Sequence, residues 1–242
     1  MPKEIMNVKE VADYLKFGET KIYSLIEKGE IPVAKIGGQY RFLKSAIDGW
    51  LFEKQRLEKK KAFDLSRVKE TKEPLAKRLL FMGMLTKALE PKDVKPIIVG
   101  GNAVEFYTAG GYATSDIDLV APSELLDEIL TKWGFKKEGR YWLNEELDVL
   151  VEAHSSTLAG DPKKITEVEI EGVTVYLLGI EDIIIDRLNA FVHWKSQDDR
   201  FWAMELMSLH KDEIDWDYLK KRAEKEQTDR ALENIQKELK SK

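Results

Sequence analysis

The stretch GYATSDIDLV, residues 111–120, carries two acidic side chains in an otherwise apolar run. The alternation of Asp116 and Asp118 with Ile117 and Leu119 predicts a β-strand, because successive side chains of a strand point to opposite faces. Both aspartates therefore project from one face of this strand, and the two apolar side chains project from the other. Since strands bury apolar side chains and avoid charge, the presence of two acidic side chains in this strand indicates a specific chemical role.

We expect that reason to be a divalent cation. Two carboxylates held this close repel each other, and one of them would take up a proton unless a cation lay between them. Mg²⁺ or Mn²⁺ would remove the conflict, because such hard cations bind one or two carboxylates together with the phosphates of a substrate. Asp116 and Asp118 are thus predicted metal ligands.

A third acid, Asp148, lies in LDVLVE, residues 147–152, again between apolar residues of an expected strand. If this strand lies beside the first, Asp148 completes a cluster of three carboxylates. Such a cluster can hold metal ions and activate a hydroxyl group for in-line attack on a phosphoryl group. The predicted catalytic and metal-binding residues are therefore Asp116, Asp118 and Asp148.

A pair of glycines supplies the other half of the predicted site. The run IIVGG, residues 97–101, indicates a short buried strand that ends in two glycines, and the residues after it indicate a helix. Free backbone N–H groups at such a turn meet phosphate oxygens, and the missing side chains allow close approach. Charged residues of a later helical stretch are further candidates for phosphate contacts. The predicted nucleotide-binding residues are Gly100, Gly101, Asn102, Ser115, Arg187 and Lys195.

The chain from Pro74 onward predicts a mixed β-sheet with helices against it. Residues 74–89 have an amphipathic helical pattern, two further pairs of strands are expected before residue 180, and the pattern beyond it is helical. We assign residues 74–180 to an α+β core and residues 181–242 to a C-terminal helical region. The polar residues 54–73, with five basic side chains between Lys54 and Lys61, are assigned to a basic connector.

Residues 1–53 predict a separate winged helix-turn-helix domain. Asn7 and Thr20 are expected caps of two successive helices, the Gly37-Gly38 pair favours a hairpin, and Ser45 is an expected cap of a last helix. In this arrangement one helix lies in the major groove of DNA, another braces it, and the hairpin reaches the neighbouring backbone. The predicted DNA-binding residues are Thr20, Lys21, Tyr23, Ser24, Lys28, Lys35, Gln39, Tyr40 and Arg41.

The first domain resembles the excisionase and MerR-like winged-helix modules. The segments that carry the resemblance are VKEVADYL, TKIYSLIEKGEIP, KIGGQYRF and IDGWL. The resemblance implies DNA binding, with the helix ETKIYSLIEKG as the recognition helix and Arg41 in the wing.

The second domain resembles the nucleotidyltransferase superfamily with the polymerase-beta-like fold. The segments IIVGG, TSDIDLV and LDVLV carry the resemblance, and the chain looks nearest to the abortive-infection and antitoxin-type branches. The resemblance implies that Asp116 and Asp118 bind metal and that Asp148 completes the site. It also implies that Gly100 and Gly101 hold a nucleoside triphosphate.

Bulk composition excludes several classes of protein. The 242 residues contain no cysteine, so disulfide bonds and thiolate metal sites are excluded. No apolar run approaches the roughly 20 residues that span a bilayer, and the N-terminus MPKEIMNVKE has no apolar signal region. We therefore expect a cytoplasmic protein without membrane contacts. Because DNA half-sites are often read by symmetric pairs of subunits, a homodimer is also expected.

These features together predict a metal-dependent nucleotidyltransferase. It would move a nucleoside monophosphate from a nucleoside triphosphate to a hydroxyl group of a protein or RNA, and the DNA-binding module would provide location or autoregulation. One alternative is a DNA-binding transcriptional regulator whose second domain is a nucleotide sensor or an inactive scaffold. Another is an antitoxin that acts through protein contact.

Overall fold

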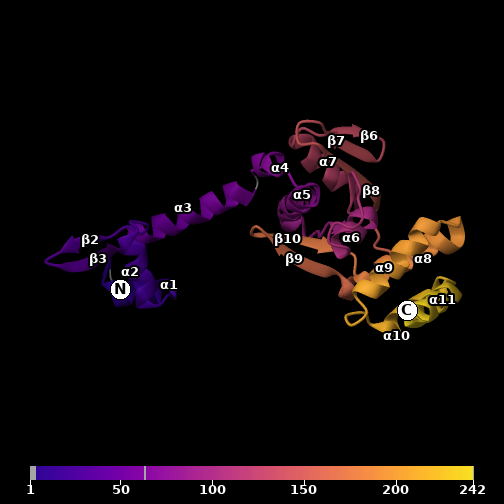
Figure 1. The fold of residues 1–242 in the computed structure, drawn as a ribbon. Helices are drawn as coiled ribbons and strands as arrows, with labels where there is room; N and C mark the ends of the chain where they lie inside the picture. The colour runs from indigo at the N-terminus through magenta and orange to yellow at the C-terminus, as the bar shows by residue number, and fades with distance from the viewer. Residues whose placement is uncertain (1–3, 63, 242) are drawn as a thin grey trace. The chain divides into compact units, whose positions relative to one another are not determined.

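The computed structural model describes residues 4–62 and 64–241, and the chain divides into two compact units, residues 1–63 and residues 64–242 (Figure 1). The first unit contains helices and a three-stranded sheet, and the second is built on a seven-stranded sheet. No helix in the described part of the chain has the length and apolar character needed to cross a membrane.

The first unit has the predicted order of helix, turn, helix, hairpin and helix, with one short strand added in front. Its strands pair in the order β1-β3-β2, and both pairs are antiparallel. The elements are β1 (Ile5–Met6), α1 (Val8–Leu15), α2 (Glu19–Glu27), β2 (Ala34–Ile36), β3 (Gln39–Leu43) and α3 (Lys44–Ala62).

The start of α1 is capped as expected, whereas α2 starts earlier than expected. The side chain of Asn7 accepts a hydrogen bond from the backbone N–H of Glu10, and the Glu10 carboxylate accepts one from the backbone N–H of Asn7, both at 2.9 Å. This reciprocal pair satisfies two N–H groups that the helix leaves without a partner. In α2 the capping position is Gly18 rather than Thr20, so the predicted cap at Thr20 is wrong.

The hairpin and the core hold the first unit together. Gly37 and Gly38 form the turn between β2 and β3 with φ angles of 58° and 79°, as a two-residue turn with positive φ requires. Val11, Ile22 and Phe42 are buried in one shared hydrophobic cluster. The cluster packs α1, α2 and β3 together, so the polar face of α2 is left in solvent.

The segment assigned as a basic connector is largely helical. Helix α3 starts at Lys44, one residue before the cap expected at Ser45, and continues to Ala62. A short helix, α4 (Ser66–Glu70), follows, and the next helix starts at Pro74. The boundary between the two compact units, after residue 63, falls inside this segment.

The second unit is built on a mixed sheet in the order β6-β7-β8-β5-β4-β10-β9. The pairs β5–β8 and β4–β10 are parallel, and the other pairs are antiparallel. The strands are β4 (Ile97–Ile98), β5 (Asp116–Val120), β6 (Lys136–Glu138), β7 (Tyr141–Asn144), β8 (Val149–Ser155), β9 (Thr166–Ile170) and β10 (Val173–Leu177).

Helices cover this sheet and complete the C-terminal part, so the predicted α+β fold class is confirmed (Figure 1). The helices after α4 are α5 (Pro74–Leu89), α6 (Gly100–Tyr107), α7 (Ser123–Lys132), α8 (Ile180–Trp194), α9 (Gln197–Leu209), α10 (Trp216–Lys225) and α11 (Asp229–Ser241). Two short 3₁₀ turns are η1 (Glu90–Lys92) and η2 (Pro162–Lys164).

Helix α5 packs closely on β10 because it has a glycine at the contact. A Cβ atom added to Gly83 would lie 2.3 Å from the Val173 Cγ2 atom. Phe81, Met82 and Leu85 on the same helix are fully buried. This packing fixes β10 and, beside it, β4 and β5, which are the strands that lead to the site described next.

Candidate active site

The turn after β4 lies directly against β5. Gly100 has a φ of 56°, and a Cβ atom added to it would lie 2.3 Å from Oδ2 of Asp118. The backbone N–H of Gly101 donates to the same oxygen at 3.2 Å. Only glycine combines this left-handed conformation with so close an approach. The turn that sequence reading assigned to phosphates therefore adjoins a carboxylate assigned to metal.

The two aspartates of β5 share one face, as the alternation predicted. Asp116 and Asp118 are half-buried, whereas Ile117 and Leu119 between and after them are fully buried. The hydroxyl of Thr114 donates to Oδ1 of Asp116 at 2.7 Å. This hydroxyl helps to orient the first carboxylate, and the sequence reading did not single it out.

The third member of the cluster is Glu152 and not Asp148. One carboxylate oxygen from each of Asp116, Asp118 and Glu152 lies within 4.8 Å of the others, and Glu152 is buried. The parallel pairing of β5 with β8 places Asp118 opposite Glu152. We call these three residues the acid cluster.

The prediction of Asp148 is wrong because β8 starts after it. Asp148 lies in the turn between β7 and β8 with a φ of 53°, so the alternation of the strand does not extend back to it. Its side chain is 94% exposed and lies 3.7 Å from the ammonium group of Lys77. Glu152 is the other acid in the same run, LDVLVE, and its position inside the strand is the signal that could have identified it.

The acid cluster has the donor set that a hard divalent cation requires. Three carboxylates supply oxygen ligands, and their mutual repulsion falls when a cation joins them. The guanidinium of Arg140 already lies on one of them, with Nε 2.7 Å from Oε1 of Glu152. The residues present therefore fit Mg²⁺ or Mn²⁺, with Asp116, Asp118 and Glu152 as ligands.

A cavity of about 430 Å³ opens beside Asp118 and Gly100. This volume lies within the range of small-molecule sites, which is roughly 300–1,000 Å³. One wall comes from the glycine turn and β5, and another comes from the C-terminal helices. The residues of the helical wall are Asp182, Ile185, Asp186, Arg187, Asn189, Arg222 and Glu226.

Arg187 lines the cavity but is already paired with two acids. Its Nη1 donates to Oδ1 of Asp199 at 2.7 Å, and its Nε donates to Oδ2 of Asp186 at 3.1 Å. Burial by itself would lower the pKa of Arg187, but the charges of Asp186 and Asp199 outweigh it, and the pKa lies above its ordinary value. The guanidinium therefore stays charged at the cavity wall.

The cavity wall does not include the four other predicted nucleotide contacts, which are Gly101, Asn102, Ser115 and Lys195. Asn102 is buried. Its amide oxygen accepts from Arg78 Nε at 2.7 Å, and its amide nitrogen donates to the carbonyl of Asp116, so both polar atoms of the side chain are used in hydrogen bonds inside the protein. Ser115 is exposed just before β5. Lys195 follows the end of α8, and its ammonium donates to the carbonyl of Val192 at 2.9 Å. The Asn102 side chain therefore ties α6 to β5 and does not reach the cavity wall.

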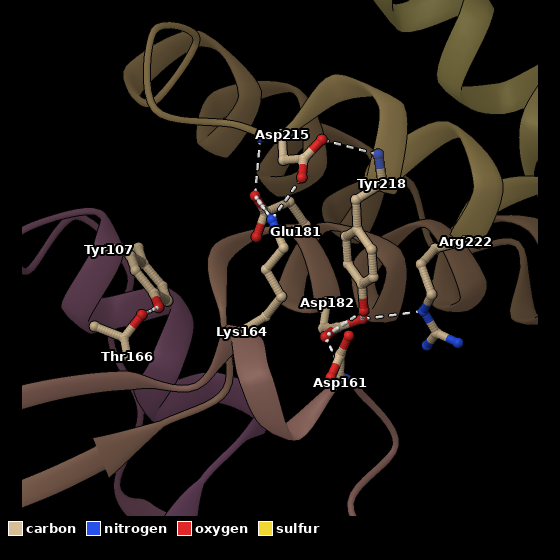
Figure 2. A network of polar contacts seen from close by, with 9 residues as sticks. All are labelled: Tyr107, Asp161, Lys164, Thr166, Glu181, Asp182, Asp215, Tyr218 and Arg222. Atoms are coloured by element: carbon tan, nitrogen blue, oxygen red, sulfur yellow. Dashed lines mark hydrogen bonds and ion pairs between the residues drawn. The ribbon is translucent and has the colours of Figure 1, made fainter.

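A buried carboxylate holds the helical wall of the cavity in place. Asp182 is 1% exposed and accepts from Tyr218 Oη at 2.9 Å, from Arg222 Nε at 3.0 Å and from the backbone N–H of Asp161 at 3.0 Å (Figure 2). Burial, together with the hydrogen bond to Asp182, raises the pKa of Tyr218, so its hydroxyl remains a donor. These bonds join α8, α10 and the segment before η2.

A second set of contacts beside it involves Lys164. Its ammonium lies 2.8 Å from Oδ2 of Asp215 and 3.4 Å from Oε1 of Glu181 (Figure 2). Glu181 also accepts from the backbone N–H of Asp215 at 2.9 Å. Sequence reading missed this network, because its members lie up to about 50 residues apart and no local pattern connects them.

The predicted DNA-binding residues of the first unit lie on its outer surface. Thr20, Lys21, Tyr23 and Lys28 on or after α2 are exposed. The Tyr23 ring meets the Tyr40 ring edge-on with centroids 6.2 Å apart, and the hairpin therefore lies next to α2. Of the remaining predicted contacts, Ser24, Tyr40 and Arg41 are partly buried, and Lys35 and Gln39 are exposed.

Several solved structures are similar to this chain over part of its length. The solution structure of the antibiotic-resistance factor ANT(2'')-Ia is 19% identical with a TM-score of 0.44, over 66% of this chain and 96% of that chain. A crystal structure of ANT(2'')-Ia in complex with adenylyl-2''-tobramycin is 17% identical with a TM-score of 0.44, over 62% and 97%. An antigenic nucleotidyltransferase-like protein from Paracoccidioides brasiliensis is 16% identical with a TM-score of 0.46, over 71% and 94%. No curated protein matches the sequence.

Two family models match the two parts of the chain. A helix-turn-helix domain matches residues 5–54, which covers the first unit from β1 into α3. A nucleotidyltransferase of unknown function (DUF6036) matches residues 79–241, which contain the glycine turn, the acid cluster and the C-terminal helices. Since this second match spans more than half of the chain, the protein belongs to this nucleotidyltransferase family and carries a helix-turn-helix domain ahead of it.

Proposed function

We propose that the second unit transfers a nucleoside monophosphate from a nucleoside triphosphate to a hydroxyl group of a protein or RNA. The observation that carries the proposal is the acid cluster, whose three oxygens lie within 4.8 Å of one another beside the glycine turn. The cluster would hold Mg²⁺ or Mn²⁺, which supplies charge neutralisation for the phosphates when bound. The first unit would bind DNA and so provide location or autoregulation.

The cavity supports a nucleoside as the occupant. Oδ1 of Asn189 is buried at the cavity wall and accepts no hydrogen bond from the described residues. A buried carbonyl oxygen without a donor is unfavourable by about 1–3 kcal/mol, so a ligand that donates to it is expected to bind there. An amino or hydroxyl group of a nucleoside is such a donor. The turn at Gly100, which lines the cavity, would face the triphosphate.

In the reaction, the acceptor oxygen forms a bond to the α-phosphorus of the triphosphate. The bond between that phosphorus and the bridging oxygen breaks, and pyrophosphate leaves. The proton of the acceptor hydroxyl passes to the carboxylate of Glu152, which replaces Asp148 in the role that the sequence reading proposed. Asp116 and Asp118 would hold the divalent cation, which would neutralise the charge of the phosphates when bound.

The test is label transfer from triphosphates labelled at the α-phosphate. The full chain is incubated with each labelled triphosphate, Mg²⁺ or Mn²⁺ and cell extract, and the labelled product is treated with protease or ribonuclease to identify the acceptor. We expect Asp116→Asn to lower the rate by at least about a hundredfold. The matched control Asp148→Asn removes an exposed acid and should stay within about threefold of the parent protein.

Two outcomes would count against the proposal. Undiminished transfer by Asp116→Asn would show that the acid cluster does not carry the reaction. If Asp148→Asn lowered the transfer rate as much as Asp116→Asn does, Asp148 would be part of the active site after all. Both variants are compared after urea unfolding has shown that they are folded.

A second candidate is a DNA-binding regulator whose second unit senses nucleotides. The helix-turn-helix domain on the same chain favours it, because nucleotide binding could then alter DNA affinity. Saturable nucleotide binding without labelled product, together with a nucleotide-dependent change in DNA affinity, would support this candidate over the enzyme.

A further inference from the structure

One cation lies on the acid cluster without being part of it. Arg140, in the turn between β6 and β7, places Nε 2.7 Å from Oε1 of Glu152. The carbonyl of Arg140 accepts from the backbone N–H of Ala153, which follows Glu152 in β8, at 3.3 Å. The backbone of the turn is thus held beside β8, and the guanidinium reduces the repulsion among the three carboxylates.

The two partners of this ion pair differ greatly in exposure. The Arg140 side chain is 62% exposed, whereas the Glu152 side chain is 7% exposed. The guanidinium can therefore leave the ion pair and be hydrated by solvent. The buried carboxylate cannot be hydrated in the same way. Pairing with a cation therefore matters more for Glu152 than for Arg140.

Tyr141 provides a second contact for the guanidinium of Arg140. Its hydroxyl accepts from Nη2 of Arg140 at 3.2 Å, and its ring centroid lies 5.3 Å from Cζ of Arg140. This contact does not depend on Glu152. A guanidinium that leaves the carboxylate can stay on the aromatic ring and remain next to the site.

We infer that Arg140 is an exchangeable counter-ion of the acid cluster, which pairs with Glu152 in the absence of a divalent cation and is displaced when one binds. The inference rests on the proposed function, because it requires that the acid cluster binds a divalent cation. If the three carboxylates held a divalent cation, its two positive charges would lie against Glu152 and would repel the guanidinium. Arg140 therefore raises the cation concentration at which the site fills, and it keeps the cluster assembled below that concentration.

The experiment measures Mn²⁺ binding to the full chain without nucleotide, from the electron paramagnetic resonance signal of free Mn²⁺. Arg140→Gln should bind Mn²⁺ about fivefold to twentyfold more tightly than the parent protein, since the ion no longer has to displace the guanidinium from its ion pair with Glu152. Glu152→Gln should bind it more weakly. Lys132→Gln is the matched control, because it removes one positive charge from an exposed ion pair on α7, and it should leave the affinity unchanged.

A double-mutant cycle separates displacement from simple charge repulsion. If Arg140 acts through its pair with Glu152, the gain from Arg140→Gln disappears when Glu152 is already Gln. An equal gain in both backgrounds would mean that Arg140 acts only as a distant positive charge, and it would overturn the inference. Unchanged or weaker binding by Arg140→Gln in the parent background would also overturn it.

The same titration separates failure of the inference from failure of the proposed function. If the parent protein and Glu152→Gln bind Mn²⁺ equally weakly, the acid cluster is not a metal site, and both the metal-dependent function and the inference fail. If the parent protein binds Mn²⁺ through Glu152 but Arg140→Gln does not bind it more tightly, only the inference fails.

Discussion

At the scale of single residues, the site depends on the contact between Gly100 and Asp118. The left-handed backbone at Gly100 turns the chain from β4 into α6, and the missing side chain leaves room for the carboxylate. The N–H of Gly101 then donates to that carboxylate. One residue without a side chain thus lets the turn into α6 and an acid of the cluster lie side by side.

Gly100→Ala should therefore damage the protein more than the same change at a glycine with open surroundings. Gly172, in the turn between β9 and β10, has a φ of 79° and nothing within 4 Å of an added Cβ, so Gly172→Ala introduces backbone strain alone. That strain costs about 1–2 kcal/mol. Gly100→Ala should lose about 1–2 kcal/mol more in urea unfolding, because Asp118 must also move. Equal losses of unfolding free energy for the two variants would show that Asp118 can move aside without a cost in stability.

At the scale of elements, α6 is anchored at both ends. Its start adjoins the acid cluster, and Tyr107 at its end donates to the carbonyl of Leu178, which follows β10, at 2.9 Å. The hydroxyls of Tyr107 and Thr166 lie 2.7 Å apart (Figure 2). Since β10 is the parallel neighbour of β4, this anchor keeps α6 aligned with the strand that leads into it.

The Tyr107 anchor predicts a loss of stability at high pH. Burial raises the pKa of Tyr107 to about 12. The folded state therefore keeps the proton at pH values where the unfolded chain, with a tyrosine pKa of about 10, releases it. This stabilisation is complete below about pH 10 and is lost as pH rises toward about 12. Between about pH 8 and pH 11 the loss should be roughly 1 kcal/mol.

Tyr107→Phe isolates this contribution from all other titrating groups. The variant should be less stable at neutral pH by roughly 1 kcal/mol, because a hydrogen bond to Leu178 is missing. The difference between variant and parent, measured by urea unfolding, should shrink as the pH rises from about 8 to about 11. A difference that stays constant over this range would show that Tyr107 titrates normally in the fold.

At the scale of the whole molecule, the chain joins two compact units with different chemistry. The first presents a helix and a hairpin with exposed basic side chains, and the second contains the acid cluster and the cavity. Each unit has its own buried core, with Val11 and Ile22 in the first and Leu85 and Ile117 in the second. Changes to the surface of one unit should therefore leave the function of the other intact.

We predict that Lys21→Gln combined with Lys35→Gln weakens DNA binding without changing nucleotidyl transfer. If both ammonium groups contact phosphates, the slope of log affinity against log salt concentration should fall by about 2. The measurement is fluorescence anisotropy with a labelled DNA duplex at several salt concentrations. A control with Lys132→Gln and Lys237→Gln removes two exposed charges from the second unit and should keep the slope. An unchanged slope in the first double variant would exclude these two lysines from the DNA interface.

The sequence alone determined the features that depend on neighbouring residues. The Asn7 cap, the Gly37-Gly38 hairpin, the order of helices and strands apart from β1, α4 and β6, and the shared face of Asp116 and Asp118 follow from relations within about four residues along the chain. They were sufficient for the fold class and for two of the three acids in the cluster.

Only the tertiary structure decided which distant groups meet. The register of β5 against β8, which selects Glu152, is a pairing between strands more than 30 residues apart, and the left-handed turn at Asp148 ends the alternation that the sequence suggested. The inward orientation of Asn102 likewise follows from its bonds to Arg78 and Asp116. The physical reason is that register and side-chain orientation are set by packing across the whole sheet, where shifting a strand by a single residue exchanges its two faces.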